Sequence, residues 1–364
     1  MSFERFLMLN LLKLMTQNMN KKFKLFQKER LPCGERNIYI MGAKVFSYLK
    51  KRKEPASVSG KAYPKIYFPH YFPDIKIFDR KPDIYNAAGE KMDIIFLRDN
   101  NFAHNPYGCG LSTSAKFIFD RFNIGLDTHV YTDGSFFDLM GSPKRRFALF
   151  MEPEVIKPRH YAELLKSKEY GINEFEKILT FNEKILNSFP NAVFFPIAAN
   201  LWHDGGGKEK TKNISMVSTA KSMCDLHKVR LSMAWECKKK GLADTFGVFD
   251  GGPKCATADY LDNYRYSIMV ENEISKYYFS ERLTSCFATK TVPVYMGCTD
   301  IGKWFNTDGI IQITPKDADN LEEVLKICSV QDYQARAAAI EDNYNRSMAY
   351  HNIWDKMYID IIKK

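Results

Sequence analysis

Short β-rich runs alternate with segments that predict helices through the first half of the chain. The runs predict strands at 65–68, 93–97, 129–131, 146–150, 178–181 and 192–196. The intervening segments predict helices at 114–122, 158–167 and 182–188. Alternating strands and helices are typical of a parallel sheet with helices on both faces.

A second series of the same kind follows residue 213. It predicts strands at 214–218, 245–249, 264–270, 292–295 and 310–313, helices at 222–239, 280–289 and 319–327, and a broken helical stretch from 331 to 362. Residues 204–212 are glycine-rich, charged and free of apolar side chains, which predicts a linker or exposed loop. We therefore expect an α/β fold with two Rossmann-like domains, 31–203 and 213–345, facing a cleft, and a C-terminal helix at 346–364.

The N-terminal segment has a different pattern. Residues 6–15 are apolar except for Asn10 and Lys13, and several basic residues follow by position 30. The basic residues follow the apolar run and no small-residue cleavage site is present, so the segment does not fit a signal peptide. We predict an amphipathic, basic helix over 1–30, which either lies on a membrane surface or packs on the protein's own body.

Composition restricts the partners. The chain has 364 residues, enough for two domains, and its 45% hydrophobic content argues against wholesale disorder. A net charge of +10 suits nucleotide phosphates, an anionic membrane or nucleic acid. The lysines are spread along the chain and no nucleic-acid module is recognised, so we expect no nucleic-acid partner. Eight cysteines without metal-binding spacing indicate reduced thiols, and hence a cytoplasmic protein, either free or peripheral at a membrane.

The most informative stretch follows the strand predicted at 264–270. This strand ends in Glu271 and Asn272, and Ser280 can cap the next helix, which places Glu281 and Arg282 in its first turn. An arginine is unfavourable at that end of a helix unless an anion binds there. A diphosphate would be held jointly by the guanidinium and the helical amides, whereas the alternative is a solvated Arg–Glu turn.

This block resembles the donor-binding signature of family 10 glycosyltransferases, the α-1,3/4-fucosyltransferases. In that family a strand ends in Glu-Asn, then come Tyr-x-Thr/Ser-Glu-Lys, a helix and Val-Pro-Val/Ile-x-x-Gly. The matching residues here are Asn272, Tyr278, Glu281 and Val292-Pro293-Val294. The resemblance implies a GT-B fold, a donor pocket lined by Asn272 and Tyr278, and a hydrogen bond from the donor sugar or ribose to Glu281. Arg282 replaces the family's lysine, which leaves the donor sugar open.

Two further blocks are similar to the same family. The strand end at Ser215–Ser218, with Lys221 and Arg230 downstream, looks like the strand and helix that face the donor diphosphate, although Thr219 stands where Asn is usual. Lys221 and Arg230 would stabilise the leaving group, or else belong to a solvated helix face. The segment 146–154 is similar to the acceptor-side Glu-Ser-Pro. Glu152 is therefore the candidate base, and Glu154 the alternative, better suited to the N-terminus of a helix.

These features predict an inverting transfer of fucose from GDP-fucose to a hydroxyl of a glycan or glycolipid. No cofactor and no metal are expected, because Asp317-Ala-Asp319 stands before a helix and fits a capping role. Two alternatives stay open: the same fold with another nucleotide-sugar donor, and a sugar- or nucleotide-binding protein without catalysis.

Overall fold

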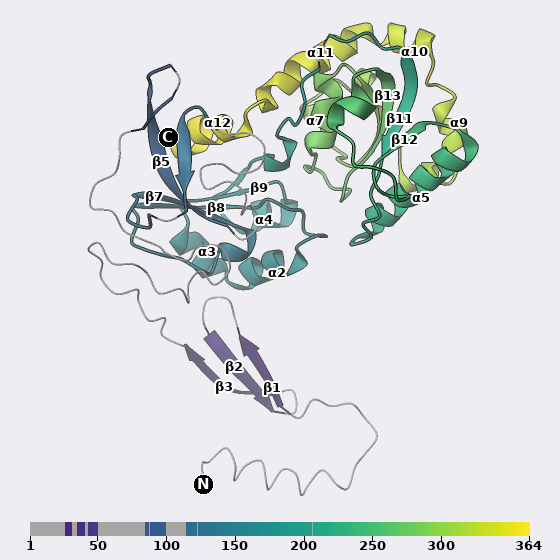
Figure 1. Ribbon diagram of the computed structural model, residues 1–364. Helices are drawn as coiled ribbons and strands as arrows, with labels where there is room; N and C mark the ends of the chain where they lie inside the picture. Colours follow the sequence, from purple (N-terminus) through teal and green to yellow (C-terminus); the bar gives the residue numbers. More distant parts are fainter. Residues whose placement is uncertain are drawn as a thin grey trace, which may run out of the picture. The chain divides into compact units, whose positions relative to one another are not determined.

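The computed structural model describes residues 26–30, 35–40, 43–49, 84–86, 88–99, 114–121, 123–205 and 207–364. The chain falls into two units, Met1–Lys53 and Glu54–Lys364, and each is considered by itself. Figure 1 shows their helices and strands. The strand predicted at 65–68 and residues 1–25 of the amphipathic helix, with its membrane contact, lie outside the described residues.

The first unit contains a three-stranded antiparallel sheet. Its strands are β1 (Phe26–Arg30), β2 (Glu35–Ile40) and β3 (Ala43–Leu49), in that order. The prediction that the N-terminal helix extends to residue 30 is therefore wrong. Phe26 pairs with Ile40 and Arg30 with Arg36, so the backbone of β1 finds its hydrogen-bond partners across a hairpin instead of along a helix.

The second unit begins with a mostly parallel sheet in the order β10-β9-β8-β7-β5-β4, with β6 also paired to β5. Only the β4–β5 pair is antiparallel among these strands. The strands are β4 (Ile84–Tyr85), β5 (Lys91–Arg98), β6 (Phe117–Asp120), β7 (Thr128–Thr132), β8 (Arg145–Leu149), β9 (Lys177–Thr180) and β10 (Ala192–Phe194). The strands predicted between 93 and 196 are confirmed.

The helix predicted over 114–122 is wrong, because Phe117–Asp120 forms strand β6 beside β5. Its Phe117 and Phe119 are buried and stand edge to face, 4.8 Å apart between ring centroids. Aromatic residues at alternate positions suit a strand that buries one face. The buried aromatic residues at alternate positions therefore fit the strand that forms here.

Both faces of this sheet are buried, as is usual for parallel sheets. On one face Phe96 and Tyr131 pack in a cluster with Tyr161 and Ile185. On the other, Ile95 and Leu97 share a cluster with Trp354. The helices concerned are α2 (Pro158–Lys166), α3 (Lys168–Glu174), α4 (Glu183–Ser188) and α12 (Ile353–Met357). The C-terminal helix α12 thus lies beside β5 although it is far away in sequence (Figure 1).

The second sheet is wholly parallel, in the order β12-β11-β13-β14-β15. Its strands are β11 (Lys212–Val217), β12 (Asp244–Phe246), β13 (Tyr264–Val270), β14 (Val292–Met296) and β15 (Ile311–Gln312). The main helices with them are α5 (Asp225–Lys240), α6 (Thr257–Leu261), α7 (Glu281–Ala288), α9 (Leu321–Leu325), α10 (Val330–Ala335) and α11 (Ala337–Ser347). The predicted strand and helix series is confirmed, and β13 has the predicted ends.

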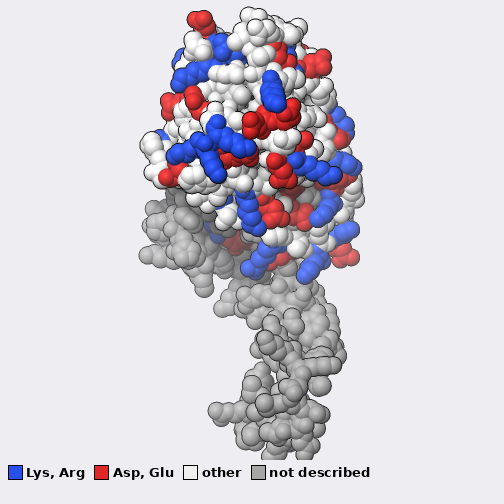
Figure 2. Space-filling model, turned by 90° about the vertical axis from the view of Figure 1, so that its right-hand side faces the viewer, with Lys and Arg blue, Asp and Glu red and all other residues white. Residues whose placement is uncertain are grey.

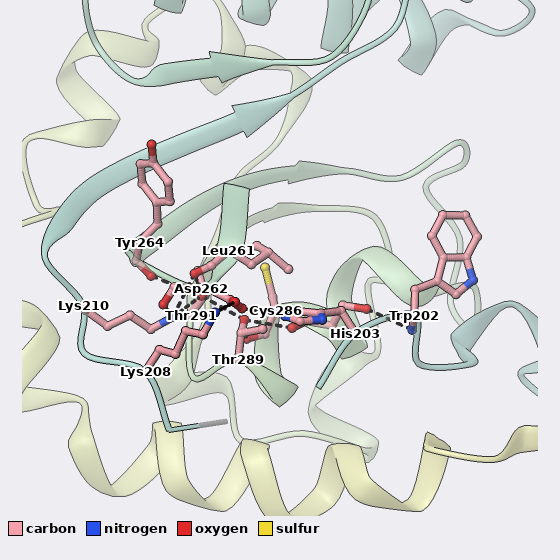
Figure 3. Close-up of polar contacts among 11 residues, drawn as sticks. Trp202, His203, Lys208, Lys210, Leu261, Asp262, Tyr264, Cys286, Thr289 and Thr291 are labelled. Carbon is pink, nitrogen blue, oxygen red and sulfur yellow. Dashed lines mark hydrogen bonds and ion pairs between the residues drawn. The ribbon is translucent and has the colours of Figure 1, made fainter. Parts of the chain in front are cut away.

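The segment between the sheets is less exposed than predicted. Lys210 is only 9% exposed, and its ammonium donates to the carbonyls of Leu261 and Asp262 and to the Thr291 hydroxyl, each at 2.9 Å (Figure 3). The Asp262 carboxylate contacts His203 and Lys208, both at 2.6 Å. A lysine aliphatic chain can be buried once its ammonium is fully hydrogen-bonded, which the charged composition of 204–212 does not reveal.

One apolar cluster spans both sheets. It combines Phe181 and Phe195 from the first sheet side with Tyr278 and Leu283 from the second. The Phe181 and Tyr278 rings lie 5.0 Å apart. Among the described residues no helix has the length and apolar character needed to cross a membrane.

Candidate active site

A cavity of about 760 Å³ is lined by residues from the carboxyl ends of strands in both sheets. Glu152 follows β8 of the first sheet, while Ser218 follows β11 and Asn272 follows β13 of the second. All of the predicted site residues line it: Glu152, Ser218, Lys221, Arg230, Asn272, Tyr278, Glu281 and Arg282. Two Rossmann-like halves with one cavity between their sheets make the fold α/β of the GT-B type.

Glu152 is the carboxylate that the first half contributes to the cavity. Its backbone carbonyl accepts a 2.7 Å hydrogen bond from the Tyr161 hydroxyl, which ties the segment after β8 to helix α2. Burial raises the pKa of Glu152, and the charge of Glu281 adds to the rise, whereas Lys157, Lys221 and Arg282 oppose it. A raised pKa brings this carboxylate closer to the range in which a general base is effective.

Glu154 has a different environment. Its carboxylate accepts from the Asn182 amide at 3.2 Å and from the Lys184 ammonium at 2.9 Å. Asn182 caps the N-terminus of α4, so Glu154 is indeed a charge at a helix start, although of α4 and not of the nearer α2. It is not among the residues that line the cavity. Glu152 is therefore the better placed of the two carboxylates.

Asn272 is oriented by two neighbours from α5. The His227 Nδ1 accepts from the Met223 amide at 3.2 Å, so its Nε2 carries the hydrogen and donates to Asn272 Oδ1 at 2.9 Å. Arg230 approaches the same Oδ1 at 3.5 Å. With its oxygen occupied, Asn272 has an amide nitrogen that donates to no other described residue and can serve a ligand in the cavity.

The histidine stays neutral in this arrangement. Burial lowers the pKa of His227, and the nearby positive charges of Arg230, Arg282 and Lys221 lower it further, against the hydrogen bond to Asn272. A protonated ring would also turn its Nδ1 hydrogen toward the Met223 N–H, which is itself a donor. His227 thus acts as a neutral support for Asn272.

Arg230 is a buried cation on the same wall. Its guanidinium donates to the Val270 carbonyl at the end of β13, at 3.0 Å. Burial, with Arg282 nearby, lowers the pKa of Arg230 to about 10, so the side chain remains charged at neutral pH. Since no carboxylate forms a direct ion pair with it among the described residues, Arg230 can attract an anion in the cavity.

The start of helix α7 is fixed by a buried carboxylate that the sequence did not single out as a site residue. Glu271 is 0% exposed and accepts from the Ser280 amide at 2.9 Å and from the Ser280 hydroxyl at 2.6 Å. Ser280 caps α7 as predicted, since its hydroxyl accepts from the Arg282 amide. Glu271 therefore locks the turn that carries Glu281 and Arg282 into the cavity.

Arg282 lies between two carboxylates. Its guanidinium is 3.7 Å from Glu271 and 3.9 Å from Glu281. Burial alone would lower the pKa of Arg282, but the charges of Glu281 and Glu271 outweigh it and raise that pKa. Burial raises the pKa of Glu271 and the Glu281 charge adds to the rise, whereas Arg282 and the hydrogen bonds from Ser280 oppose it. The helix therefore presents a permanent cation at its N-terminus, as an anion site requires.

The cavity holds more positive than negative side chains. Its cations are Lys157, Lys221, Arg230, Lys254 and Arg282, and its carboxylates are Glu152 and Glu281. Sequence reasoning missed Lys157, Lys254 and the aromatic residues Trp202 and Tyr260, because they come from separate segments, with Tyr260 in helix α6, and share no motif. Elsewhere the charges are mixed: on the face in Figure 2, basic and acidic side chains are interspersed.

The described residues contain no group of three or more His, Cys, Asp or Glu placed to hold a metal ion. Asp317 accepts from the amide and hydroxyl of Thr314, both at 2.7 Å, at the start of α8 (Pro315–Ala318). Asp317 thus belongs to a helix cap, but that of α8, in which it lies. The prediction that it caps the helix after Asp319 is wrong, because the N-cap of α9 is Asn320, which makes no side-chain capping bond. Among the described residues, the free cysteines are Cys224, Cys237, Cys255, Cys286, Cys298 and Cys328.

The end of β11 comes very close to the turn after β12. Gly247 has a φ of +94°, and a Cβ placed there would lie 2.2 Å from the Ser218 carbonyl oxygen. Both residues line the cavity. Only a glycine accommodates this φ and this contact together.

We expect Gly247→Ala to be destabilising by about 1–3 kcal/mol beyond the cost of its positive φ alone, because the added Cβ overlaps the Ser218 carbonyl. Gly251→Ala is the matched control, because Gly251 also has a positive φ, +84°, but has nothing within 4 Å of its Cβ position. Urea unfolding of both variants measures the difference. Equal losses of stability would show that the approach of Gly247 to Ser218 carries no weight.

Comparison with known proteins gave matches only among structures. No protein-family model and no curated protein matches the chain. An α1,3-fucosyltransferase with GDP overlaps at a TM-score of 0.41 and 10% identity, covering 79% of this chain and 94% of that one. The pneumococcal O-GlcNAc transferase GtfA with UDP and GlcNAc gives 0.43 and 9%, covering 91% and 75%. An α,α-trehalose-phosphate synthase (UDP-forming) from Burkholderia vietnamiensis gives 0.43 and 9%, covering 65% and 70%.

Proposed function

We propose that the protein is an inverting glycosyltransferase that moves fucose from GDP-fucose to a hydroxyl of a glycan acceptor without a metal ion. The observation that carries the proposal is the composition of one cavity. A carboxylate of raised pKa, Glu152, stands on the wall from the first half. The wall from the second half supplies Arg230, Arg282, Lys221 and the Asn272 amide, which are donors suited to a diphosphate.

In the proposed reaction Glu152 removes the proton from the acceptor hydroxyl. The acceptor oxygen bonds to the anomeric carbon while the bond from that carbon to the diphosphate oxygen breaks on the opposite face. Arg230, Arg282 and the N-terminal amides of α7 stabilise the negative charge that develops on the departing nucleoside diphosphate. Glu281, at the first position of α7, is placed to accept from a donor hydroxyl.

A donor other than GDP-fucose remains a candidate because of Arg282. Arg282 stands where family 10 enzymes have lysine, and its planar guanidinium can bind oxygens in pairs, which a lysine cannot do. Another deoxysugar or hexose nucleotide would use the same cavity and the same base. The nucleotide itself therefore has to be identified first.

The first test is a calorimetric titration with GDP, UDP, dTDP and CMP, without metal and then with magnesium. We expect GDP to bind without metal at least about tenfold more tightly than the others, a difference of about 1.4 kcal/mol. Tight binding of UDP or dTDP instead would show that the donor is a sugar nucleotide other than GDP-fucose. Binding of none would favour a non-catalytic role, and a strict need for magnesium would contradict the metal-free mechanism.

A further inference from the structure

Asp133 is a buried carboxylate at the carboxyl end of the strands of the first sheet, the same end that carries Glu152. It directly follows β7, the neighbour of β8, and its residue is 1% exposed. Its φ is +38°, which lies in the left-handed region. Aspartate tolerates this region better than most residues, but the conformation still costs energy. Strained backbone of this kind is found where the surrounding structure fixes a functional position.

The Asp133 side chain holds the backbone that leads to Glu152. Its Oδ1 accepts a hydrogen bond from the Met151 amide at 2.9 Å. The last amide of this strand to pair with the sheet is that of Phe150, which donates to Leu179 O at 3.0 Å. At the next residue, the Asp133 carboxylate therefore replaces the neighbouring strand as the hydrogen-bond acceptor of the backbone amide.

A second side chain holds the same segment. The Tyr161 hydroxyl of α2 donates to the Glu152 carbonyl at 2.7 Å. The Tyr161 ring is buried and lies 4.3 Å from that of Phe150. The peptide unit between Phe150 and Met151 and the one between Glu152 and Pro153 are thus each held by a side chain from a different element.

The two carboxyl groups also influence each other electrostatically. Burial raises the pKa of Asp133 to about 7, the bond from the Met151 amide opposes the rise, and the charge of Glu152 adds to it. A group with this pKa would be conspicuous as a base in its own right. Asp133 is not among the residues that line the cavity, however, and so cannot reach a substrate there.

We propose that Asp133 is a positioning residue that sets the place of Glu152 in the cavity through its hydrogen bond to the Met151 amide. This inference rests on the proposed function, because it assigns Asp133 to the base of that reaction. A displacement of about 1 Å at a reacting group can reduce a rate by about 10²-fold. Loss of the Asp133 bond should therefore reduce turnover and leave the donor wall unchanged.

The test compares Asp133→Ala with Asp133→Asn. Asparagine keeps an oxygen for the Met151 amide and tolerates the positive φ, whereas alanine does neither. We expect alanine to lower kcat for transfer from GDP-fucose by about 10- to 100-fold, with the Kd for GDP changed less than about twofold. Asparagine should recover most of kcat. If the alanine variant fails to fold, Asp133→Gly serves instead, because it removes the same carboxylate without strain at the positive φ and should lower kcat to the same extent.

The outcomes separate the two proposals. An unchanged kcat in Asp133→Ala, or an asparagine variant as slow as alanine, would overturn the positioning role while leaving the transferase intact. Equal losses of kcat and GDP affinity would show a general structural effect and would also overturn it. A wild-type protein that transfers no sugar would remove the proposed function, and this inference with it.

Discussion

Glu152→Gln is expected to lower kcat by about 10²–10⁴-fold, the usual contribution of a general base. Glutamine keeps the size and hydrogen-bonding oxygen of the side chain but cannot take a proton from the acceptor. The Kd for the nucleotide should stay nearly unchanged, because the donor wall belongs to the other half of the protein. Single-turnover transfer and calorimetry on the same preparation measure the two quantities.

Glu154→Gln is the matched control, since Glu154 is bonded to Asn182 and Lys184 and lies off the cavity. It should leave kcat within about twofold of the wild type and cost at most about 1 kcal/mol of stability. Full activity of Glu152→Gln would refute the assignment of the base. Loss of activity in Glu154→Gln alone would move the assignment to Glu154.

The pH dependence of the wild-type transfer rate gives a second test of the role of Glu152. Glu152 has to be deprotonated to act, and burial with the Glu281 charge raises its pKa above the ordinary value of 4.5. The rate should therefore rise with pH through a midpoint above 4.5 and fall on acidification through it. This acid limb should disappear in Glu152→Gln.

Arg282→Gln is expected to reduce kcat by about 10²–10³-fold and to weaken nucleotide binding, because one cation is lost from the diphosphate site. It should also destabilise the fold. Glu271 is 0% exposed, and Arg282 is the cation 3.7 Å from it. Removing the cation leaves a buried carboxyl with less compensation, which can cost about 3–5 kcal/mol. Transfer rates and urea unfolding measure the two effects.

A double variant separates the two effects. Glu271→Gln with Arg282→Gln removes both charges, so stability should partly recover while nucleotide binding stays weak. Arg282→Lys keeps the charge and should lose less affinity than Arg282→Gln. If the double variant recovered nucleotide binding as well, the effect of Arg282 would be structural and its role at the diphosphate would be refuted.

The second half of the chain was the more predictable from sequence. Strand β13 runs from Tyr264 to Val270 as predicted, because a run that is apolar apart from Arg265 and Ser267 ends abruptly in Glu271 and Asn272. Ser280 caps α7 as predicted, since a serine before a turn with an acidic residue is a local signal. Residues linked by one local motif come together because strand and helix carry them to the same end of a sheet.

The remaining features depend on contacts between distant segments. Asp133 carries no motif, and its importance appears only when β7 lies beside β8 and its carboxylate meets the Met151 amide. Lys210 resembles a linker residue until the carbonyls after α6 surround its ammonium. The strand β6 was hidden because four residues are too few to distinguish its period from that of a helix.

The apolar cluster shared by both sheets also bears on how the protein unfolds. Phe195 and Leu283 belong to one buried cluster, and Trp354 from the C-terminal helix joins it. If the chain were cut between the sheets, each half would expose to water the apolar side chains that the other half covers. The two halves should therefore melt in a single cooperative transition, and neither should be recoverable as a soluble fragment.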